Sequence, residues 1–117
     1  MNGIAFKNLI ASVSGTVKVY PDFIPEKNSL PAIQYTHIAE GSSRVLSGNK
    51  SGVWNTWRVI AVGNNNAERT ALFESLQALD NSKNEDFSNV FIIAQSNLPY
   101  TPEDKTRSLF VDIKTYG

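Results

Sequence analysis

The chain contains no cysteine, and His37 is its single histidine. Without thiols it can form neither a disulfide nor a thiolate metal site. A metal would have to depend on carboxylates, and Asp80, Glu85 and Asp86 do not have the spacing of an EF-hand loop. We therefore expect no cofactor and no resident metal ion.

A surplus of charge of one sign is also missing, because 11 acidic residues balance 11 basic ones. A neutral chain has no long-range attraction for nucleic acid or an anionic membrane. It is also less protected against self-association. No apolar run approaches the ~20 residues that a membrane span needs, and the N-terminus lacks the pattern of a signal peptide. We expect no membrane partner.

The length of 117 residues predicts one domain, covering residues 1–117. A chain of this size buries roughly 65% of its unfolded surface, which suffices for a core without disulfides or metals. We find no internal repeat and no low-complexity segment. The sequence therefore indicates a single folded unit.

Residues 52–79 organise the chain. Residues 52–62 carry the strand-favouring Trp54 and Trp57 with several β-branched side chains, and they predict a central strand. Asn65 and Glu68 then have the spacing of a capping box, with Asn in place of Ser or Thr. A helix should follow over 67–79, with an apolar stripe of Leu72, Phe73, Leu76 and Leu79.

The flanking patterns complete an α+β fold. A short N-terminal helix should end at Gly15, with a stripe of Phe6, Leu9, Ile10 and Val13. Further strands are expected over 16–20, 32–39, 87–95 and 109–116. The element order is helix, three strands, helix, two strands. It predicts a mostly antiparallel sheet of about four to five strands with two helices packed on one face.

Alternation along the last strand assigns its side chains to two faces. Leu109, Val111 and Ile113 should face the core, which turns Phe110 and Tyr116 outward. The face of the central strand that carries Trp54 is also partly apolar. A sheet covered on one side needs only one apolar face. The second apolar set is therefore either inner packing or a surface for another subunit.

Two long polar segments, 40–52 and 96–106, exceed what a tight hairpin requires. The first is compatible with a strand extension through residues 44–46 and a turn at 48–49. Long polar projections on a small domain usually carry function or move freely.

Several chemical interpretations are weak. His37 as a general base, near Asp22 or Glu40, would lie inside a strand with no nucleophile motif nearby, where packing is the commoner role. Residues 48–52 lack the Gly-Lys-Ser/Thr ending of a phosphate loop and precede a strand. We do not expect an enzyme.

Lys50, Trp54, Trp57 and Arg58 interleave basic and aromatic residues, as single-strand nucleic-acid platforms do. Alternation splits the set, because Trp54 and Arg58 share a face and Trp57 does not. The alternative is that both tryptophans belong to the core, at least one of them under a helix.

The linear order of motifs resembles the tail-completion, or tail-terminator, proteins of long-tailed bacteriophages. Residues 19–21 read Val-Tyr-Pro, 30–35 read Leu-Pro-Ala-Ile-Gln-Tyr, and 44–48 read Arg-Val-Leu-Ser-Gly. A strand with Arg-Val-Ile-Ala-Val at 58–62, a helix rich in Ala, Glu and Leu, and a closing strand at 109–113 follow. The resemblance covers nearly the whole chain, with a shorter N-terminal helix and loops richer in Asn and Ser.

This resemblance implies a structural virion protein of the phage tail, assembled in the host cytoplasm. Such proteins form a ring, usually a hexamer, on the last ring of the tail tube. The ring stops tube polymerisation and presents a surface to the head–tail connector protein, while DNA passes through the lumen as cargo. On this hypothesis Trp54, Phe110 and Tyr116 cover a subunit interface. The contacts to tube or connector would come from Arg44, Leu46, Lys50, Tyr100, Lys105 and Arg107.

Other classes of function remain open. The chain could be a neighbouring head–tail joining protein, or a monomeric adaptor or binding module whose polar loops are only connections. A small enzyme that uses His37 is a further alternative. The adaptor predicts no self-assembly at any concentration, and the enzyme predicts a phenotype for His37→Ala.

Overall fold

The computed structural model describes residues 3–15, 17–22, 24, 31–44, 50–83, 87, 89–99 and 106–116, with the backbone alone for 42–44 and 50–53. The elements follow the predicted order. They are α1 (Gly3–Ser14), β1 (Lys18–Pro21), β2 (Ala32–Arg44), β3 (Lys50–Gly63), α2 (Asn66–Gln77), β4 (Asn89–Asn97) and β5 (Arg107–Tyr116).

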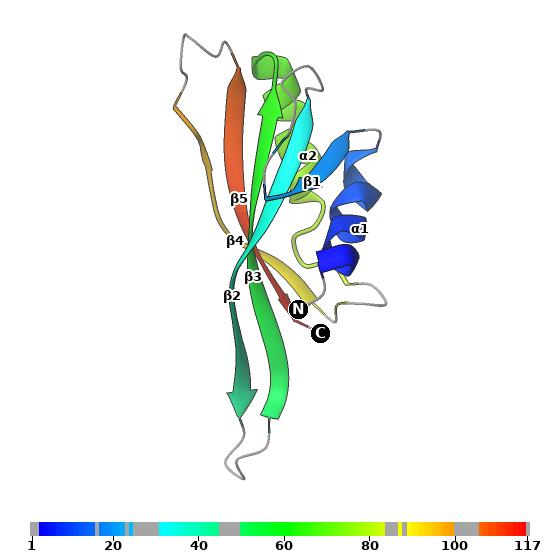
Figure 1. Cartoon of the computed structure of the whole chain (residues 1–117), viewed down its shortest axis with the longest axis vertical. Helices are drawn as coiled ribbons and strands as arrows, with labels where there is room; N and C mark the ends of the chain where they lie inside the picture. The colour runs from blue at the N-terminus through cyan, green and yellow to red at the C-terminus, as the bar shows by residue number, and fades with distance from the viewer. Residues whose placement is uncertain are drawn as a thin grey trace.

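The five strands form one sheet in the order β1-β2-β3-β5-β4, with β3 at its centre. The pairs β2–β3, β3–β5 and β4–β5 are antiparallel, and β1 runs parallel to β2. Figure 1 shows both helices on the same side of this sheet. The predicted α+β class is confirmed, and the β1–β2 pairing makes the sheet mixed rather than purely antiparallel.

The N-terminal helix forms as its apolar stripe predicts. Phe6, Leu9 and Ile10 are buried, while Lys7 and Asn8 face solvent. Gly15 ends the helix with a φ of 64°, a left-handed conformation that glycine adopts without the Cβ clash of other residues. A helix of this length is marginal alone, so its stability comes from docking on the sheet.

The second helix begins with the predicted capping contacts. Asn65 Oδ1 accepts a hydrogen bond from the Glu68 backbone N–H at 2.9 Å. Glu68 Oε1 accepts one from the N–H of Asn64 at 2.7 Å, one residue before the N-cap. The helix ends at Gln77, two residues earlier than predicted, yet Leu79 is buried because a hydrogen-bonded turn returns it to the core.

The core lies between the two helices and one face of the sheet. Its centre is Trp57 of β3, 1% exposed, whose ring stacks on Phe6 of α1 with centroids 4.3 Å apart. Trp57 Nε1 donates to Thr115 Oγ1 at 3.0 Å, so the buried indole N–H is satisfied. The remaining core side chains come from the predicted stripes and strand faces, including Tyr35, Val59, Leu72, Leu76, Leu109 and Val111.

Two β-bulges interrupt the predicted alternation. One leaves Ile38 without a register partner between His37 and Ala39, and the other does the same for Ile93 in β4. Both bulges adjoin one cross-strand row, in which Trp57 of β3 and Ile113 of β5 lie opposite each other. A bulge increases the right-handed twist of its strand. In Figure 1 the strands accordingly cross one another near the middle of the sheet.

A long hairpin projects from one end of the sheet. β3 pairs with β5 only from Trp54 onward. On the other side of Trp54, toward the hairpin tip, β3 continues to pair with β2 as far as Lys50 and Arg44. The molecule therefore measures 55 × 24 × 23 Å along its principal axes, and Figure 1 shows the hairpin extending below the rest. The strand extension proposed for residues 40–52 is confirmed up to Arg44.

The second polar segment is shorter than predicted. Ser96 and Asn97 belong to β4, in register with Phe110 and Leu109 of β5. Expecting a loop from residue 96 was therefore wrong, because backbone pairing with β5 continues past the apolar part of the strand. The predicted strand start at residue 87 was also early, since β4 begins at Asn89.

Candidate interaction surfaces

The sheet face opposite the helices is the largest surface of interest. Registers across β2, β3, β5 and β4 put one set of side chains on it, in rows such as Thr36–Arg58–Asp112–Ala94. In the described part of the chain no helix or strand covers this outer face. Its ring-bearing residues on β3, β4 and β5 are Trp54, Phe91, Phe110 and Tyr116, and the register puts Tyr20 of β1 on the same face.

One end of the outer face carries an aromatic cluster. Trp54 lies directly opposite both Gly41 and Tyr116 in the register. Lys114 Nζ lies 4.4 Å from the centroid of the Trp54 ring and 5.4 Å from that of Tyr116. Phe91 meets Tyr116 edge-on at 6.0 Å. The cation and the two rings attract one another, which fixes them as one apolar patch with a positive tip.

The middle of the outer face carries an ion pair. Arg58 Nε donates to Asp112 Oδ1 at 2.8 Å and Arg58 Nη2 to Oδ2 at 2.9 Å, a two-pronged geometry that favours guanidinium and carboxylate. These hydrogen bonds, with the charge of Asp112, raise the pKa of Arg58. The Arg58 side chain is 48% exposed and that of Asp112 is 11% exposed. The guanidinium also lies 4.9 Å from the Phe110 ring centroid.

The structure brings together two of the three predicted interface residues. Trp54 and Tyr116 are cross-strand neighbours, whereas Phe110 stands six residues up β5, about 20 Å away. All three are half-buried on the outer face. Sequence reasoning missed Phe91, the ring neighbour of Tyr116. The alternation of Phe91 with Val90 and Ile92 already placed Phe91 on the face opposite to theirs. Only the pairing of β4 with β5 shows that this face adjoins Tyr116.

Three of the predicted tube or connector contacts are described, and they divide between the two ends of the sheet. Arg44 and Lys50 pair near the tip of the hairpin, while Arg107 begins β5 opposite Gly63 at the other end of β3. Leu46, Tyr100 and Lys105 lie outside the described residues. The hypothesis that one set faces the tube and the other the connector thus requires contacts at opposite ends of the molecule.

His37 is part of the packing. Its Nε2 lies 2.8 Å from Asn55 Oδ1, and its ring meets Trp57 edge-on with centroids 4.9 Å apart. The hydrogen bond and the ring contact hold the imidazole against the core side of the hairpin base. Among the described residues, no group of three or more His, Asp or Glu side chains is placed to hold a metal ion.

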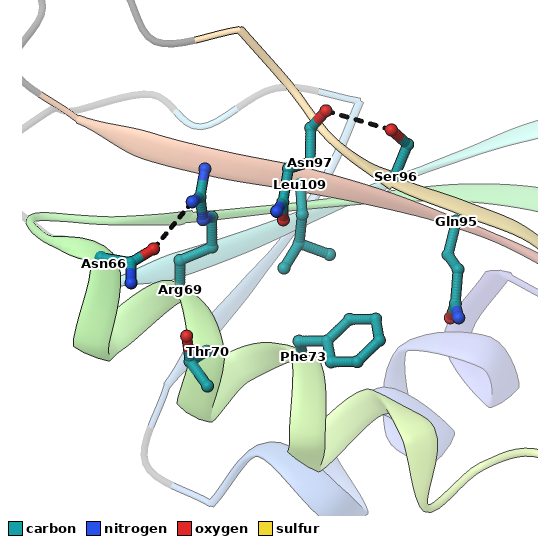
Figure 2. A pocket seen from close by; sticks show the side chains of 8 residues that line it. All are labelled: Asn66, Arg69, Thr70, Phe73, Gln95, Ser96, Asn97 and Leu109. Atoms are coloured by element: carbon teal, nitrogen blue, oxygen red, sulfur yellow. Dashed lines mark hydrogen bonds between the residues drawn. The ribbon is translucent and has the colours of Figure 1, made fainter.

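A pocket of about 300 Å³ lies between α2 and the end of β4 (Figure 2). Phe73 and Leu109 supply its apolar surface. Its polar lining comes from Asn66, Arg69, Thr70, Gln95, Ser96 and Asn97. Arg69 Nη2 donates to Asn66 Oδ1 at 2.7 Å, which holds the guanidinium along α2. Of the residues that line this pocket, the sequence singled out Phe73 and Leu109, and both were predicted to face the core.

Comparison with known proteins gives a likeness of fold. No protein-family model matches the chain, and no curated protein matches it. Among solved structures it resembles a chain of the virion of a native gene transfer agent particle, with a TM-score of 0.56 and 12% sequence identity. The match covers 92% of this chain and 83% of that chain. The chain therefore has a fold that a virion component also has.

The helices add one further observation. Neither helix in the described part of the chain is long and apolar enough to cross a membrane.

Proposed function

We propose that the chain is a structural virion protein that closes the end of a tail tube as a ring. In this role it stops tube polymerisation and forms the surface that joins the tail to the head connector. The order of sequence motifs supports this role, and so does the likeness of fold to a chain from a virion. The ring is most simply a hexamer, as the resemblance implies.

The observation that carries the proposal is the outer sheet face. Trp54, Phe110 and Tyr116 stand on it, and no described helix or strand covers them. Aromatic residues are enriched at protein interfaces, where they contribute much of the binding free energy. A neighbouring subunit that covered this face would bury the half-exposed rings. It would leave the Arg58–Asp112 pair as a fixed polar contact.

A closed ring also needs two different patches that meet head to tail. The outer face and the projecting hairpin are such patches, because they differ in shape and composition and lie on different parts of one subunit. The two ends of the elongated molecule would then be available to the tube protein and to the connector.

Growing tail tubes provide the direct test. Purified tube protein is polymerised with and without this chain, and tube lengths and ends are measured by electron microscopy. We expect shorter tubes with one capped end in its presence. The Phe110→Ser/Tyr116→Ser variant serves as control and should leave tubes uncapped. Tubes that grow unchanged would reject the terminator role. Binding to the isolated connector alone would indicate another head–tail joining protein.

A monomeric adaptor is the second candidate, and one observation favours it. Lys114 and Arg58 already lie over the outer-face rings, which shields part of the apolar surface within a single chain. An adaptor would bind its partner without forming oligomers, with or without tubes.

A further inference from the structure

The β4 edge of the sheet is closed over its first half by the turn after α2. Val90 N–H donates to Ser82 O at 2.9 Å, and Asn81 N–H donates to Val90 O at 2.8 Å. Ile92 N–H donates to Asp80 Oδ1 at 3.0 Å. The outward backbone groups of Val90 and the outward N–H of Ile92 are therefore satisfied within the chain.

The second half of β4 is open in the described structure. Leu98 N–H donates inward to Ser108 O at 3.0 Å, so alternation turns the backbone groups of Gln95 and Asn97 outward. The Asn97 carbonyl accepts a hydrogen bond from the Ser96 hydroxyl at 3.1 Å. Within the described part of the chain, nothing pairs with the Gln95 backbone or with the Asn97 N–H. An open edge of this kind is a template for a strand from another chain.

A strand added to this edge would place its side chains beside α2. The register puts Gln95 and Asn97 on the helix side of the sheet, in rows with the buried Val111 and Leu109. Residues directly opposite each other in paired strands share a face. Those residues of an added strand that stand opposite Gln95 and Asn97 would therefore turn their side chains toward the pocket in Figure 2.

α2 and β4 run in opposite directions past this pocket. Gln77 Nε2 donates to Gln95 Oε1, so the C-terminal end of α2 lies beside Gln95. A Cβ on Gly63 would meet the backbone N of Arg69 at 3.1 Å, so the start of α2 lies against the end of β3. Asn97 belongs to the cross-strand row two residues before Gly63. The first turns of α2 therefore lie at the Asn97 end of the pocket.

The two ends of the pocket differ in charge. Phe73 gives the end beside Gln95 an apolar surface. Arg69, one helical turn earlier, is half-buried, and its guanidinium donates to the neutral amide of Asn66. Of the described residues that line the pocket none is acidic, and β4 carries no charged residue. The lining therefore has one positive charge and no carboxylate to match it.

The acidic residues of α2 do not supply that carboxylate. Glu68 Oε1 accepts a hydrogen bond from Asn64 N–H at 2.7 Å, Glu74 is exposed, and neither lines the pocket. Arg107 begins β5 at the same end of the sheet as Asn97 and adds a second positive charge there. Hydrogen bonds between a guanidinium and a carboxylate are stronger than neutral ones. This end of the pocket therefore favours an acidic side chain.

The described strands of this chain do not offer a matching segment. Their acidic residues are Glu40 and Asp112. Asp112 belongs to β5, which is paired on both sides, and its carboxylate binds Arg58. Glu40 follows the bulge at Ile38, which interrupts the regular spacing that an added strand needs. The occupant that fits is therefore a segment of a different protein.

We propose that the Gln95–Asn97 edge of β4 binds an extended segment of another protein as an added strand, with a carboxylate of that segment held by Arg69. An apolar side chain two residues from this carboxylate lies over Phe73. Backbone hydrogen bonds supply affinity, and the pocket supplies selectivity for the acidic residue. The site goes beyond the proposed ring, because it needs no contact between copies of this chain.

A synthetic peptide tests the site on the purified full chain. The probe is a fluorescein-labelled Thr-Val-Thr-Glu-Thr-Val-Thr amide, whose Val and Glu side chains share one face and whose sequence is the same in both directions. We expect its fluorescence anisotropy to rise saturably as the chain is titrated, with a Kd below about 1 mM. The same peptide with Gln in place of Glu should bind about tenfold more weakly or worse.

Exchanging the two charges separates a specific contact from general attraction. Arg69→Glu should abolish binding of the Glu peptide and create binding of a peptide with Lys in its place. Lys7→Glu makes the same change of charge on the exposed face of α1 and should leave the Kd within about twofold. Circular dichroism checks that both variants keep the fold. Equal loss of Glu-peptide binding in the two variants would contradict the proposal.

Strand addition is tested in the peptide, where the fold of the chain is not at risk. N-methylation removes a backbone N–H, and successive N–H groups of a strand point to opposite sides. Methylation of the Val and Glu residues, or instead of the internal Thr residues, should abolish binding in one case and be tolerated in the other. Equal tolerance of both would show that a carboxylate binds without strand addition, which overturns the proposal.

The outcomes separate this inference from the proposed function. Absence of saturable Glu-peptide binding up to about 1 mM would overturn the site and leave the ring function standing. Self-association that Arg69→Glu abolishes would identify a second copy as the occupant, which also contradicts the proposal. Peptide binding by a chain that leaves tail tubes uncapped would support the site and reject the terminator role alone.

Discussion

Gly41 and Trp54 face each other across β2 and β3, and the indole occupies the space where a side chain at position 41 would begin. A Cβ on Gly41 would lie 2.7 Å from Trp54 Cε2, closer than real Cβ contacts come. The ring thus covers the glycine and also contacts the Lys114 ammonium group. This packing fixes the base of the projecting hairpin and one corner of the outer face.

Gly41→Ala should therefore displace Trp54 and lower the free energy of unfolding by about 1–3 kcal/mol. The tryptophan fluorescence of the folded variant should shift as the indole leaves its position. Gly3→Ala is the matched control, because a Cβ there meets nothing within 4 Å. Equal stability of the two variants in urea unfolding would show that Trp54 moves aside freely.

Thr115→Val tests the buried hydrogen bond from Trp57. The substitution keeps the shape of the side chain and removes the acceptor of the indole N–H. A buried donor left without a partner costs about 1–3 kcal/mol, and we expect a loss of stability in this range. Thr36→Val, on the half-buried outer face, should change the unfolding midpoint little. A neutral Thr115→Val would mean that Trp57 finds another acceptor.

The two partners of the Arg58–Asp112 ion pair should respond unequally to substitution. Arg58→Met leaves the carboxylate of Asp112, mostly buried, without its guanidinium, whereas Asp112→Asn leaves a guanidinium that water can reach. Removing one partner of a buried pair is costly because the remaining charge is uncompensated. We expect the larger fall in the urea midpoint for Arg58→Met. A larger fall for Asp112→Asn would mean that the guanidinium of Arg58, rather than the carboxylate of Asp112, is the charge that depends on its partner.

The outer-face aromatics should matter for assembly more than for folding. Phe110→Ser/Tyr116→Ser should give a folded monomer with a native circular dichroism spectrum, because no described element packs over these rings. Ile113→Ser, on the opposite face of β5, removes a fully buried side chain and should cost about 3 kcal/mol or more. Unfolding of the double variant would assign its residues to the core instead.

Alkaline pH should weaken the fold through Tyr35. Burial, followed by the negative charge of Asp22, raises the pKa of Tyr35 above its usual 10.0. The protonated phenol is favoured in the folded state, so its contribution is complete below pH 10 and is lost as pH rises through the folded pKa. Tyr35→Phe should flatten the fall in the urea midpoint as the pH rises above about 10. An unchanged slope would assign that fall to other groups.

Most of the fold follows from local patterns in the sequence. The stripe from Phe6 to Val13, the capping pair Asn65 and Glu68, and the alternation from Leu109 to Ile113 each predicted an element that the structure contains. These signals are strong because each one comes from residues close together in the chain. The outward placement of Trp54, Phe110 and Tyr116 followed in the same way.

The features that depend on strand pairing were not predictable in this way. The bulges at Ile38 and Ile93 reverse the faces of their strands, and β4 continues to Asn97 because β5 offers partners. The pocket between Phe73 and Leu109 arises from residues on α2, β4 and β5. Its position depends on the sheet order β3-β5-β4, which no local period encodes.

The most direct test of the central claim, that this chain assembles into a ring, is its mass in solution across a concentration series, by light scattering after size exclusion. We predict a discrete species near six subunits, in equilibrium with the 12.9 kDa monomer and reduced in the Phe110→Ser/Tyr116→Ser variant. The series is repeated with tail tubes, where the chain should appear at one tube end. A strict monomer at every concentration, absent from tube ends as well, would contradict the account.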